Sequence, residues 1–530
     1  MKMKPWIGRA LLGAGAAFVA MFFALHLLHP RADFPNFSPW MDYSKYTDEG
    51  WYGNAAVSYF IRGGWYVAGD FNPAVALPVW PFLEWILFHF TGVSLTAARI
   101  LAVLIFGGSL ALTYALVRRN ASIWAAMLAV VILASNAYLY CFSRVAILEP
   151  LLIFLMLLSW QLALQLPRAS RPRQRTSLFI GIGLLLCAMV LTKTTAVFLF
   201  PAVAYLALLP WRREPRKLLA YAATMGISTA LLWLAYYGFI VKPHYLQDFH
   251  YLFVANVYPQ PTTAFGWLMA FWYAVHGALW IDPRFVTLAA ALVLLSVFFF
   301  RELWRNPLFV ASFLAAAGYL FFIGLHNNMQ PRYYQVVAFP LTIGAVLAIQ
   351  AVANLQGWQR TVIATAAAAT LLFSVFINCR ETVWFAFHPE YTFVSAAENL
   401  ARYIDQHPNR NRTLLSISGS NISMITGLPA ICDDFGTLDL PDRIRRYQPG
   451  WYAAWNELDP GTLEDLHTQY SLTEVANFPA YDDEDRNRLI LYRLTPLDQE
   501  NPKAINPRKR HALPMGAHPA RAAQIRRVAD

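Results

Sequence analysis

The sequence is poor in charged residues. Only 14% of its 530 residues are Asp, Glu, Lys or Arg, against about 25% in an ordinary soluble domain. The same chain is 57% hydrophobic, and long apolar runs recur as far as residue 380. A bilayer core needs roughly 20 apolar residues per helix. The composition therefore excludes a soluble globular protein and predicts a polytopic α-helical membrane protein.

Cysteine is also scarce, and two further features are missing. The four cysteines show no C-x-x-C spacing, which argues against a disulfide framework and a zinc site. No small-residue cleavage site follows the apolar run Ala10–Leu28, so we interpret this run as an uncleaved first transmembrane helix. The net charge of +11 does not indicate nucleic-acid binding, because the excess Lys and Arg lies in short loops and in residues 499–530.

The placement of Lys and Arg predicts about 11 spans with the N-terminus in the cytoplasm. Residues 177–210 are too long for one span, and basic clusters flank both ends, so they must form a hairpin with its outer tip at Thr192–Thr195. The expected spans are about residues 8–28, 97–117, 121–140, 147–166, the hairpin, 218–240, 285–300, 307–325, 334–354 and 361–379.

Two long loops are expected on the outer side of this membrane domain (residues 1–380), at 30–96 and 242–284. Within the first, Pro78–Phe90 is apolar but too short to span, so a helix on the membrane surface is expected there, and Phe265–Trp280 is a candidate for a second.

After the last apolar run the composition becomes that of a soluble domain. Residues 381–498 contain two strand-like segments, Thr413–Ser418 and Leu489–Leu494, with helical patterns between, which predicts an extracytoplasmic α/β domain. The acidic stretches Asp433-Asp434 and Asp482–Asp485 are interpreted as solvated turns, since no EF-hand spacing is present. Residues 499–530 are basic and rich in Pro and Ala, which predicts a disordered tail.

The unusual polar residues of the membrane domain fall on the outer side in this topology. The first outer loop holds an acidic pair, Asp48-Glu49, among aromatic residues and glycines. The others at or just beyond the outer surface are Arg144, Glu149, Lys193, His326 and Arg332. Ionisable groups next to spans are costly unless solvated or paired, and are candidates for function. Their one-sided placement is what an outward-facing catalytic cleft requires.

These elements resemble a known group of membrane enzymes. The acidic pair, then Glu149, then Lys193 at the hairpin tip, then Pro331-Arg332-Tyr333 come in an order similar to that of the glycosyltransferase C (GT-C) superfamily. The nearest branch is the protein O-mannosyltransferase and aminoarabinose transferase group (glycosyltransferase family 39-like). The resemblance covers most of residues 8–380, which makes 1–380 the expected GT-C-like catalytic domain.

The resemblance implies transfer of a sugar from a polyprenyl-phosphate donor to a hydroxyl of a lipid, glycan or protein acceptor at the outer face of the inner or plasma membrane. Such an enzyme needs a carboxylate for the acceptor's proton, cations for the leaving phosphate and an apolar groove for the prenyl chain. Asp48 matches the family's first-loop aspartate and takes the role of the base, with Glu49 as an orienting or second carboxylate. The residues expected to bind the substrate or its phosphate are Arg144, Glu149, Lys193, His326, Arg332 and Tyr333.

Simpler readings of the same residues stay open. In these interpretations Asp48 or Thr47 would cap a helix that starts near Gly50, and Glu149 would only face the dipole of its helix. Lys193 would extend its ammonium group to the lipid headgroups. Asp48 and Glu149 are also candidates for holding a divalent cation, and no other cofactor is expected.

One departure from the family and two other classes of function remain. Many such enzymes carry Lys-Pro-Pro or His-Pro-Pro before the first surface helix, whereas Ala76–Pro81 contains no cation here, so the phosphate would rely on Lys193 and Arg332. A transporter or flippase of lipid-linked sugars is expected to have broken helices and internal repeats, but the spans are clean apolar runs without a repeat. A non-catalytic membrane sensor on the same scaffold is the third possibility. The expected partners are the donor, its acceptor and membrane lipid.

Overall fold

The computed structural model describes residues 5–40, 42–255, 258–353, 355–481 and 486–497. Within these ranges, nine helices are long and apolar enough to cross a membrane. They are built on α1 (Pro5–His26), α4 (Leu95–Asn120), α7 (Leu148–Ala163), α8 (Pro172–Thr192), α9 (Phe200–Leu208), α10 (Pro215–Tyr236), α15 (Pro307–His326), α16 (Tyr334–Val352) and α17 (Gly357–Phe387).

Two further apolar elements complete the bundle. The pair α5 (Ile123–Ser135) and α6 (Ala137–Ser143) counts as a tenth candidate span, and α14 (Pro283–Phe299) is a shorter apolar helix. The expectation of about 11 helices is therefore confirmed, and the protein is an integral multi-pass membrane protein. The expected hairpin is present as α8 and α9, joined by the 3-10 segment Thr194–Leu199.

One expected clean span is broken. Where the sequence predicted a single helix over 121–140, α5 and α6 meet at Asn136 with a bend of 66°. The side chain of Asn136 caps α6 through the backbone N–H of Leu139 and donates to the carbonyl of Ile281. Asn side chains compete with the helical backbone for its hydrogen bonds, so the break follows from this residue. Asn378 of α17 satisfies another freed group, the N–H of Ala137.

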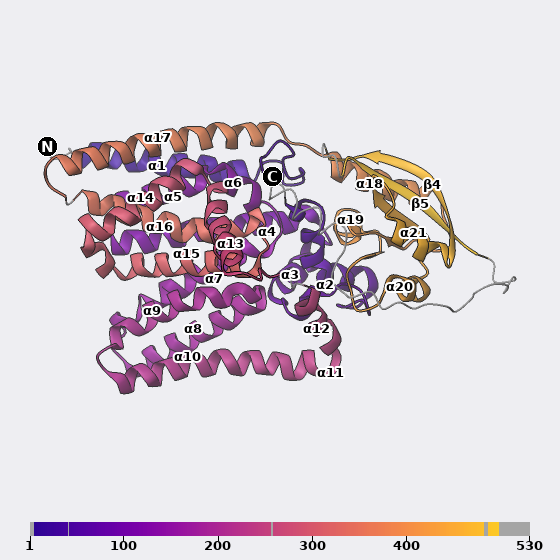
Figure 1. Cartoon of the computed structure of the whole chain (residues 1–530), viewed down its shortest axis with the longest axis horizontal. Coiled ribbons are helices and arrows are strands. Elements are labelled where there is room, and N and C mark those ends of the chain that lie inside the picture. Colours follow the sequence, from indigo (N-terminus) through magenta and orange to yellow (C-terminus); the bar gives the residue numbers. More distant parts are fainter. Residues whose placement is uncertain (1–4, 41, 256–257, 354, 482–485, 498–530) are drawn as a thin grey trace.

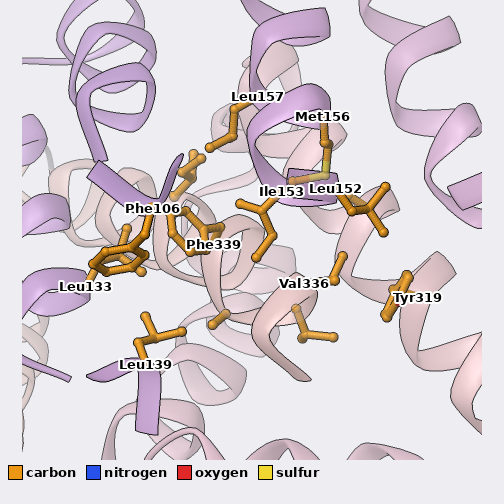
Figure 2. Close-up of a cluster of buried hydrophobic side chains, with 14 of the residues drawn as sticks. Phe106, Leu133, Leu139, Leu152, Ile153, Met156, Leu157, Tyr319, Val336 and Phe339 are labelled. Atoms are coloured by element: carbon orange, nitrogen blue, oxygen red, sulfur yellow. The ribbon is translucent and has the colours of Figure 1, made fainter. Parts of the chain in front are cut away.

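The membrane helices pack around α16. This helix has the largest buried share of the candidate spans, and it contacts α4, α5, α7, α14, α15 and α17. Figure 2 shows the packing, in which Val336 and Phe339 of α16 meet apolar side chains from the neighbouring helices, labelled Phe106, Leu133, Leu139, Leu152, Ile153, Met156, Leu157 and Tyr319.

Short helices cover one end of this bundle (Figure 1). The first loop forms α2 (Asp48–Arg62) and α3 (Val79–Thr91), with 3-10 turns at Tyr43–Lys45 and Pro73–Val75. The second forms a π-helical turn at Tyr237–Val241, then α11 (Lys242–His244), α12 (Leu246–Ala255), α13 (Ala264–His276) and a 3-10 turn at Gly277–Trp280. Helices are thus present at both expected surface segments. The remaining 3-10 turns are Leu166–Arg168, Leu209–Trp211, Arg301–Arg305 and Pro331–Tyr333.

Helix α2 carries the acidic pair in its first turn. Thr47 is its N-cap residue, and Asp48 and Glu49 follow at once, where carboxylates are favoured by the positive end of the helix dipole. The helix ends at Gly63, which has φ +77° and donates to the carbonyl of Tyr59. This left-handed conformation suits glycine.

The C-terminal domain is a small α/β fold. Its five-stranded mixed sheet has the order β2-β1-β3-β5-β4, in which β1 is parallel to β2 and β3, and β5 is antiparallel to β3 and β4. The strands are β1 (Leu414–Leu415), β2 (Ala430–Ile431), β3 (Trp451–Trp455), β4 (Tyr470–Pro479) and β5 (Arg488–Pro496). The helices are α18 (Thr392–Gln406), α19 (Gly419–Thr426), α20 (Leu440–Tyr447) and α21 (Pro460–His467).

Alternation along the strands divides this domain into two cores. Leu414 and Trp451 face the cluster that contains Phe393, whereas Leu415 and Tyr452 join the other cluster. The soluble α/β domain is therefore confirmed. α17 continues to Phe387, so the expected boundary at 380/381 falls inside a helix. The predicted tail at 499–530 and the stretch Asp482–Asp485 lie outside the described residues.

The first loop and the C-terminal domain are locked together. Asp33 accepts hydrogen bonds from the backbone N–H groups of Phe393 and Val394 and so caps α18 from a distant part of the chain. The backbone N–H of Gly50 donates to Oδ1 of Asn421, which seats α2 against α19. The turn of α2 that carries Asp48 is therefore held by the C-terminal domain.

Candidate active site

A cavity of about 650 Å³ lies between the bundle and the C-terminal domain. We call it the main cavity. Side chains from both parts line it, and the charged and polar ones include Thr47, Asp48, Lys193, Thr194, Thr195, His326, Asn328, Gln330, Arg332, Asp434 and Arg486. The aromatic ones are Tyr46, Trp51, Tyr52, Phe71, Phe253, Tyr258, Phe322, Tyr333, Phe435 and Trp455. Such a mixture of apolar walls and convergent polar groups is typical of a ligand site.

Asp48 and Arg332, which both line this cavity, form a direct ion pair. Nη2 of Arg332 lies 2.8 Å from Oδ2 of Asp48, and both side chains are almost fully buried. Asp42 holds the other side of the same guanidinium, with Nη1 of Arg332 2.5 Å from Oδ1 and the backbone N–H of Arg332 donating to Oδ2. The short turn Pro331–Tyr333 is thereby fixed at the start of α16. Two carboxylates thus share one arginine.

The protonation of Asp48 is set by its surroundings. The pKa of Asp48 is raised to about 6, chiefly by burial; the charges of Arg332 and Lys193 lower it, whereas those of Asp42 and Glu149 raise it. A carboxylate with this pKa is ionised at neutral pH and still able to accept a proton, which suits a general base. The geometry agrees, because Asp48 lines the main cavity.

Lys193 forms the second ion pair of the site. The α8 helix ends just before Lys193, whose extended backbone starts the turn into α9. Its ammonium group pairs with Oε1 of Glu149 and lies 4.3 Å from the centre of the Tyr333 ring. Glu149 is in the first turn of α7, and among the described residues its Oε2 atom has no hydrogen-bond partner. The structure thus brings Asp48, Glu149, Lys193, Arg332 and Tyr333 together.

The charges of this cluster do not balance. Three carboxylates, Asp42, Asp48 and Glu149, face two cations, Lys193 and Arg332. With all five groups ionised the cluster carries one net negative charge, and protonation of one carboxylate makes it neutral. A proton gained here therefore strengthens the site for a second negative charge nearby.

Glu49 is directed away from the main cavity. Its carboxylate makes a bidentate pair with Arg99 at 2.7 and 2.6 Å, and it accepts the backbone N–H of Ala146. Arg99 also donates to the carbonyls of Pro30 and Ala32. Of the two roles predicted for Glu49, this arrangement fits the orienting one, because the pair fixes the start of α2 against α4 and the chain before α7.

Arg144 and His326 are placed differently from the cluster. The sequence predicted that Arg144 binds the substrate or its phosphate. In the structure Arg144 donates to the carbonyls of Leu28 and His29 and to the hydroxyl of Tyr140, and Glu149 pairs with Lys193. Arg144 therefore anchors the end of α1. His326 does line the main cavity, with its ring stacked on Phe322 and in edge contact with Tyr258.

Among the described residues, the fold brings no set of metal-ligating side chains together at Asp48 and Glu149, which the sequence suggested as ligands of a divalent cation. Within the described part of the chain, no group of three or more His, Cys, Asp or Glu side chains is arranged to hold a metal ion. Each of these two carboxylates instead faces a basic side chain.

Sequence reasoning missed several residues of the site. Asp42 lies only six positions before Asp48, yet its partner Arg332 follows 290 residues later, and no spacing pattern connects them. Trp455 and Arg486 belong to the C-terminal domain, to which the sequence assigned no part in the site. The one sequence signal for these residues was their predicted position on the outer side of the membrane.

Comparison with known proteins agrees with this architecture. Residues 72–236 match the model of a family described as dolichyl-phosphate-mannose-protein mannosyltransferase. Compared by sequence with curated proteins, the chain matches none.

Solved structures give broader matches. ArnT from Cupriavidus metallidurans, bound to undecaprenyl phosphate, aligns with 91% of this chain and 98% of its own at a TM-score of 0.59 and 14% identity. The Archaeoglobus fulgidus oligosaccharyltransferase, in complex with Zn and sulfate, aligns with 90% of this chain and 75% of its own (TM-score 0.51, 12% identity). Mycobacterial arabinofuranosyltransferase AftD aligns with 91% and 40% (TM-score 0.50, 15% identity).

These likenesses define the class first: the chain is a multi-pass membrane protein with the GT-C glycosyltransferase fold. Within that class, the predicted resemblance to the protein mannosyltransferase and ArnT branch is confirmed by the family match and the structural similarity to ArnT.

Proposed function

We propose that the protein is a glycosyltransferase that moves a sugar from a polyprenyl-phosphate donor to an acceptor hydroxyl at the outer face of the membrane. One observation carries the proposal. A buried carboxylate, Asp48, and two cations, Lys193 and Arg332, line the same cavity in a chain with the GT-C fold. This is the set of groups that a transfer from a phosphosugar requires.

Asp48 is the base in this proposal. The acceptor oxygen attacks the anomeric carbon of the sugar, the bond from that carbon to the phosphate oxygen breaks with its electron pair going to the phosphate, and the acceptor proton goes to Asp48. The phosphate thus gains one negative charge as Asp48 loses one. Asp48 is paired with Arg332. Once Asp48 is protonated it no longer offsets the charge of Arg332, which then attracts the leaving phosphate more strongly.

Lys193 and Arg332 are the phosphate-binding cations, and both lie close to the ring of Tyr333. The ring of Tyr333 lies 4.3 Å from Nζ of Lys193 and 5.1 Å from the guanidinium carbon of Arg332. Glu149 and Asp42 hold the two cations in place. Fixed charges of this kind stabilise developing charge without reorganisation. Lys193 and Arg332 also supply the positive charge that many related enzymes carry in the stretch corresponding to Ala76–Pro81.

An apolar path supports a lipid-linked donor. The main cavity shares Ala76, Thr194 and Phe253 with a neighbouring cavity of about 280 Å³. That cavity in turn shares Val190 and Trp233 with an open groove of about 530 Å³ between α8, α9 and α10. The groove is lined almost wholly by apolar side chains and lies among spans. A prenyl chain in this path would leave its phosphate beside Lys193.

The neighbours and the charge pattern support the remaining assignments. ArnT was solved with undecaprenyl phosphate, and the archaeal oligosaccharyltransferase has been solved with a tethered acceptor peptide. The basic loop at 166–175 and the pair Arg118-Arg119 lie at the ends of spans that the positive-inside rule assigns to the cytoplasm. The C-terminal domain that begins after α17 and the cavity are then on the extracytoplasmic side of the inner or plasma membrane. The proposed acceptor is a lipid, a glycan or a protein.

The test uses purified protein in lipid nanodiscs and in vesicles, with a polyprenyl-phosphate sugar. Release of polyprenyl phosphate, slow with water and faster with an acceptor, is the expected result. Transbilayer movement of the intact donor without any release would instead identify a flippase. If neither release of polyprenyl phosphate nor movement of the donor is observed, the result favours a sensor and overturns the proposal.

A further inference from the structure

The C-terminal domain supplies one wall of the main cavity. The residues of this wall are Ile417, Asp434, Phe435, Trp455 and Arg486. We call these five residues the domain wall. Asp48, Lys193 and Arg332 line the same cavity.

The domain wall comes from one edge of the sheet. Ile417 follows β1, Asp434 and Phe435 follow β2, and Trp455 is the last residue of β3. These three strands are parallel, so their carboxyl ends meet at the same edge. Arg486 precedes β5, which runs antiparallel to β3 and pairs Leu489 with Trp455. In open α/β sheets, ligands bind outside the carboxyl ends of parallel strands.

Two side chains of the domain wall, Trp455 and Arg486, make defined contacts with their surroundings. Trp455 donates from Nε1 to the hydroxyl of Ser418 at 3.0 Å, and its ring packs against Phe393 and Tyr481. The guanidinium of Arg486 lies 4.3 Å from the centre of the Tyr46 ring. An aromatic surface flanked by an arginine and an aspartate matches a sugar ring, whose C–H face packs on an aromatic ring and whose hydroxyls bond to planar charged groups.

The position of the wall relative to Asp48 gives it a role. The domain is docked on the turn of α2 that carries Asp48, through Gly50 and Asn421. A group held on the wall therefore lies in the same cavity as Asp48 and beside the turn that carries it, where an attacking hydroxyl can reach its base. Resting on the function proposed above, we propose that the domain wall is the acceptor subsite and that it takes a carbohydrate unit, so that the enzyme transfers its sugar to a glycan.

The experiment compares transfer with hydrolysis in the full-length protein. Soluble oligosaccharides, a Ser/Thr-containing peptide and a phospholipid are offered with the same donor, and polyprenyl phosphate release is measured with and without each. The variants are Trp455→Ala, Trp455→Phe and Arg486→Gln, and Arg488→Gln on the exposed start of β5 is the matched control. A thermal melt of each variant checks folding.

The expected result is transfer to an oligosaccharide, with the ratio of transfer to hydrolysis roughly tenfold lower in Trp455→Ala and Arg486→Gln through a higher acceptor KM. Trp455→Phe recovers most of it, and Arg488→Gln matches wild type. An unchanged ratio in both variants, or equal loss of transfer and hydrolysis, would overturn the acceptor subsite while leaving the proposed function standing. Wall-dependent transfer to the peptide or phospholipid alone would overturn the carbohydrate assignment. Absence of any release from wild type would count against the proposed function itself.

Discussion

Arg332 places Nη2 2.8 Å from Oδ2 of Asp48, so the proposed base and a proposed phosphate-binding cation form one ion pair. The pair links the two halves of the reaction. Proton uptake by Asp48 and charge gain by the leaving phosphate occur together, and the attraction of Arg332 moves from one to the other. Asp42 keeps the guanidinium in position while this happens.

The first prediction concerns pH. Burial raises the pKa of Asp48 to about 6, and the ionised form is the active base. We expect kcat/KM to reach its maximum at pH values well above 6 and to fall as the pH drops through 6. Asp42→Asn removes a negative charge that raises this pKa, so its acidic limb should shift to lower pH. Asp405→Asn, at an exposed ion pair, is the control. A limb that stays in place in Asp42→Asn would contradict this reading.

The second prediction concerns Lys193. Replacing it with glutamine removes a cation near the leaving phosphate, and such losses typically cost 10²–10³-fold in rate. We expect donor-dependent release to fall by roughly 10²-fold. Lys217→Gln removes an exposed lysine that is likewise paired with a glutamate and should leave release near wild type. If Lys193→Gln loses less than tenfold while Tm is unchanged, Lys193 does not serve the phosphate.

The sequence was sufficient for the membrane architecture because each span leaves a local signal, an apolar run bounded by basic loops. Lys193 and Arg332 could be found in the same way, as isolated ionisable groups at the outer ends of spans. The partners of these residues could not be found, since Asp42–Arg332 and Glu49–Arg99 are contacts between segments far apart in the chain. The break at Asn136 was missed because an asparagine within an apolar run is only a weak signal.

A third prediction separates the two roles of Glu49. Its bidentate pair with Arg99 is buried, and removing one member of a buried pair usually costs about 3–5 kcal/mol. We expect Glu49→Gln to lower the free energy of unfolding and Tm strongly. Glu398→Gln, at a partly exposed pair with Arg31, should cost about 1 kcal/mol or less. Loss of kcat in Glu49→Gln with an unchanged melt would instead assign Glu49 to the chemistry.

A fourth prediction tests the docking of the C-terminal domain. A Cβ added at Gly50 would overlap the backbone of Ser420 and Asn421, so Gly50→Ala must push α19 away from α2. We expect a lower Tm and faster proteolysis between the two parts, together with loss of release. At Gly64 no atom lies within 4 Å of an added Cβ, so Gly64→Ala should behave like wild type. Normal release and stability in Gly50→Ala would show that this contact does not hold the site.

The central claim is that Asp48 takes the acceptor's proton, and Asp48→Asn tests it most directly because the amide keeps the size of the side chain and cannot act as the base. Purified Asp48→Asn and wild type are given the same polyprenyl-phosphate sugar and acceptor, and polyprenyl phosphate release is measured after a thermal melt has shown that both are folded. We predict a loss of roughly 10²–10⁴-fold. Undiminished release by a folded Asp48→Asn protein would contradict the account.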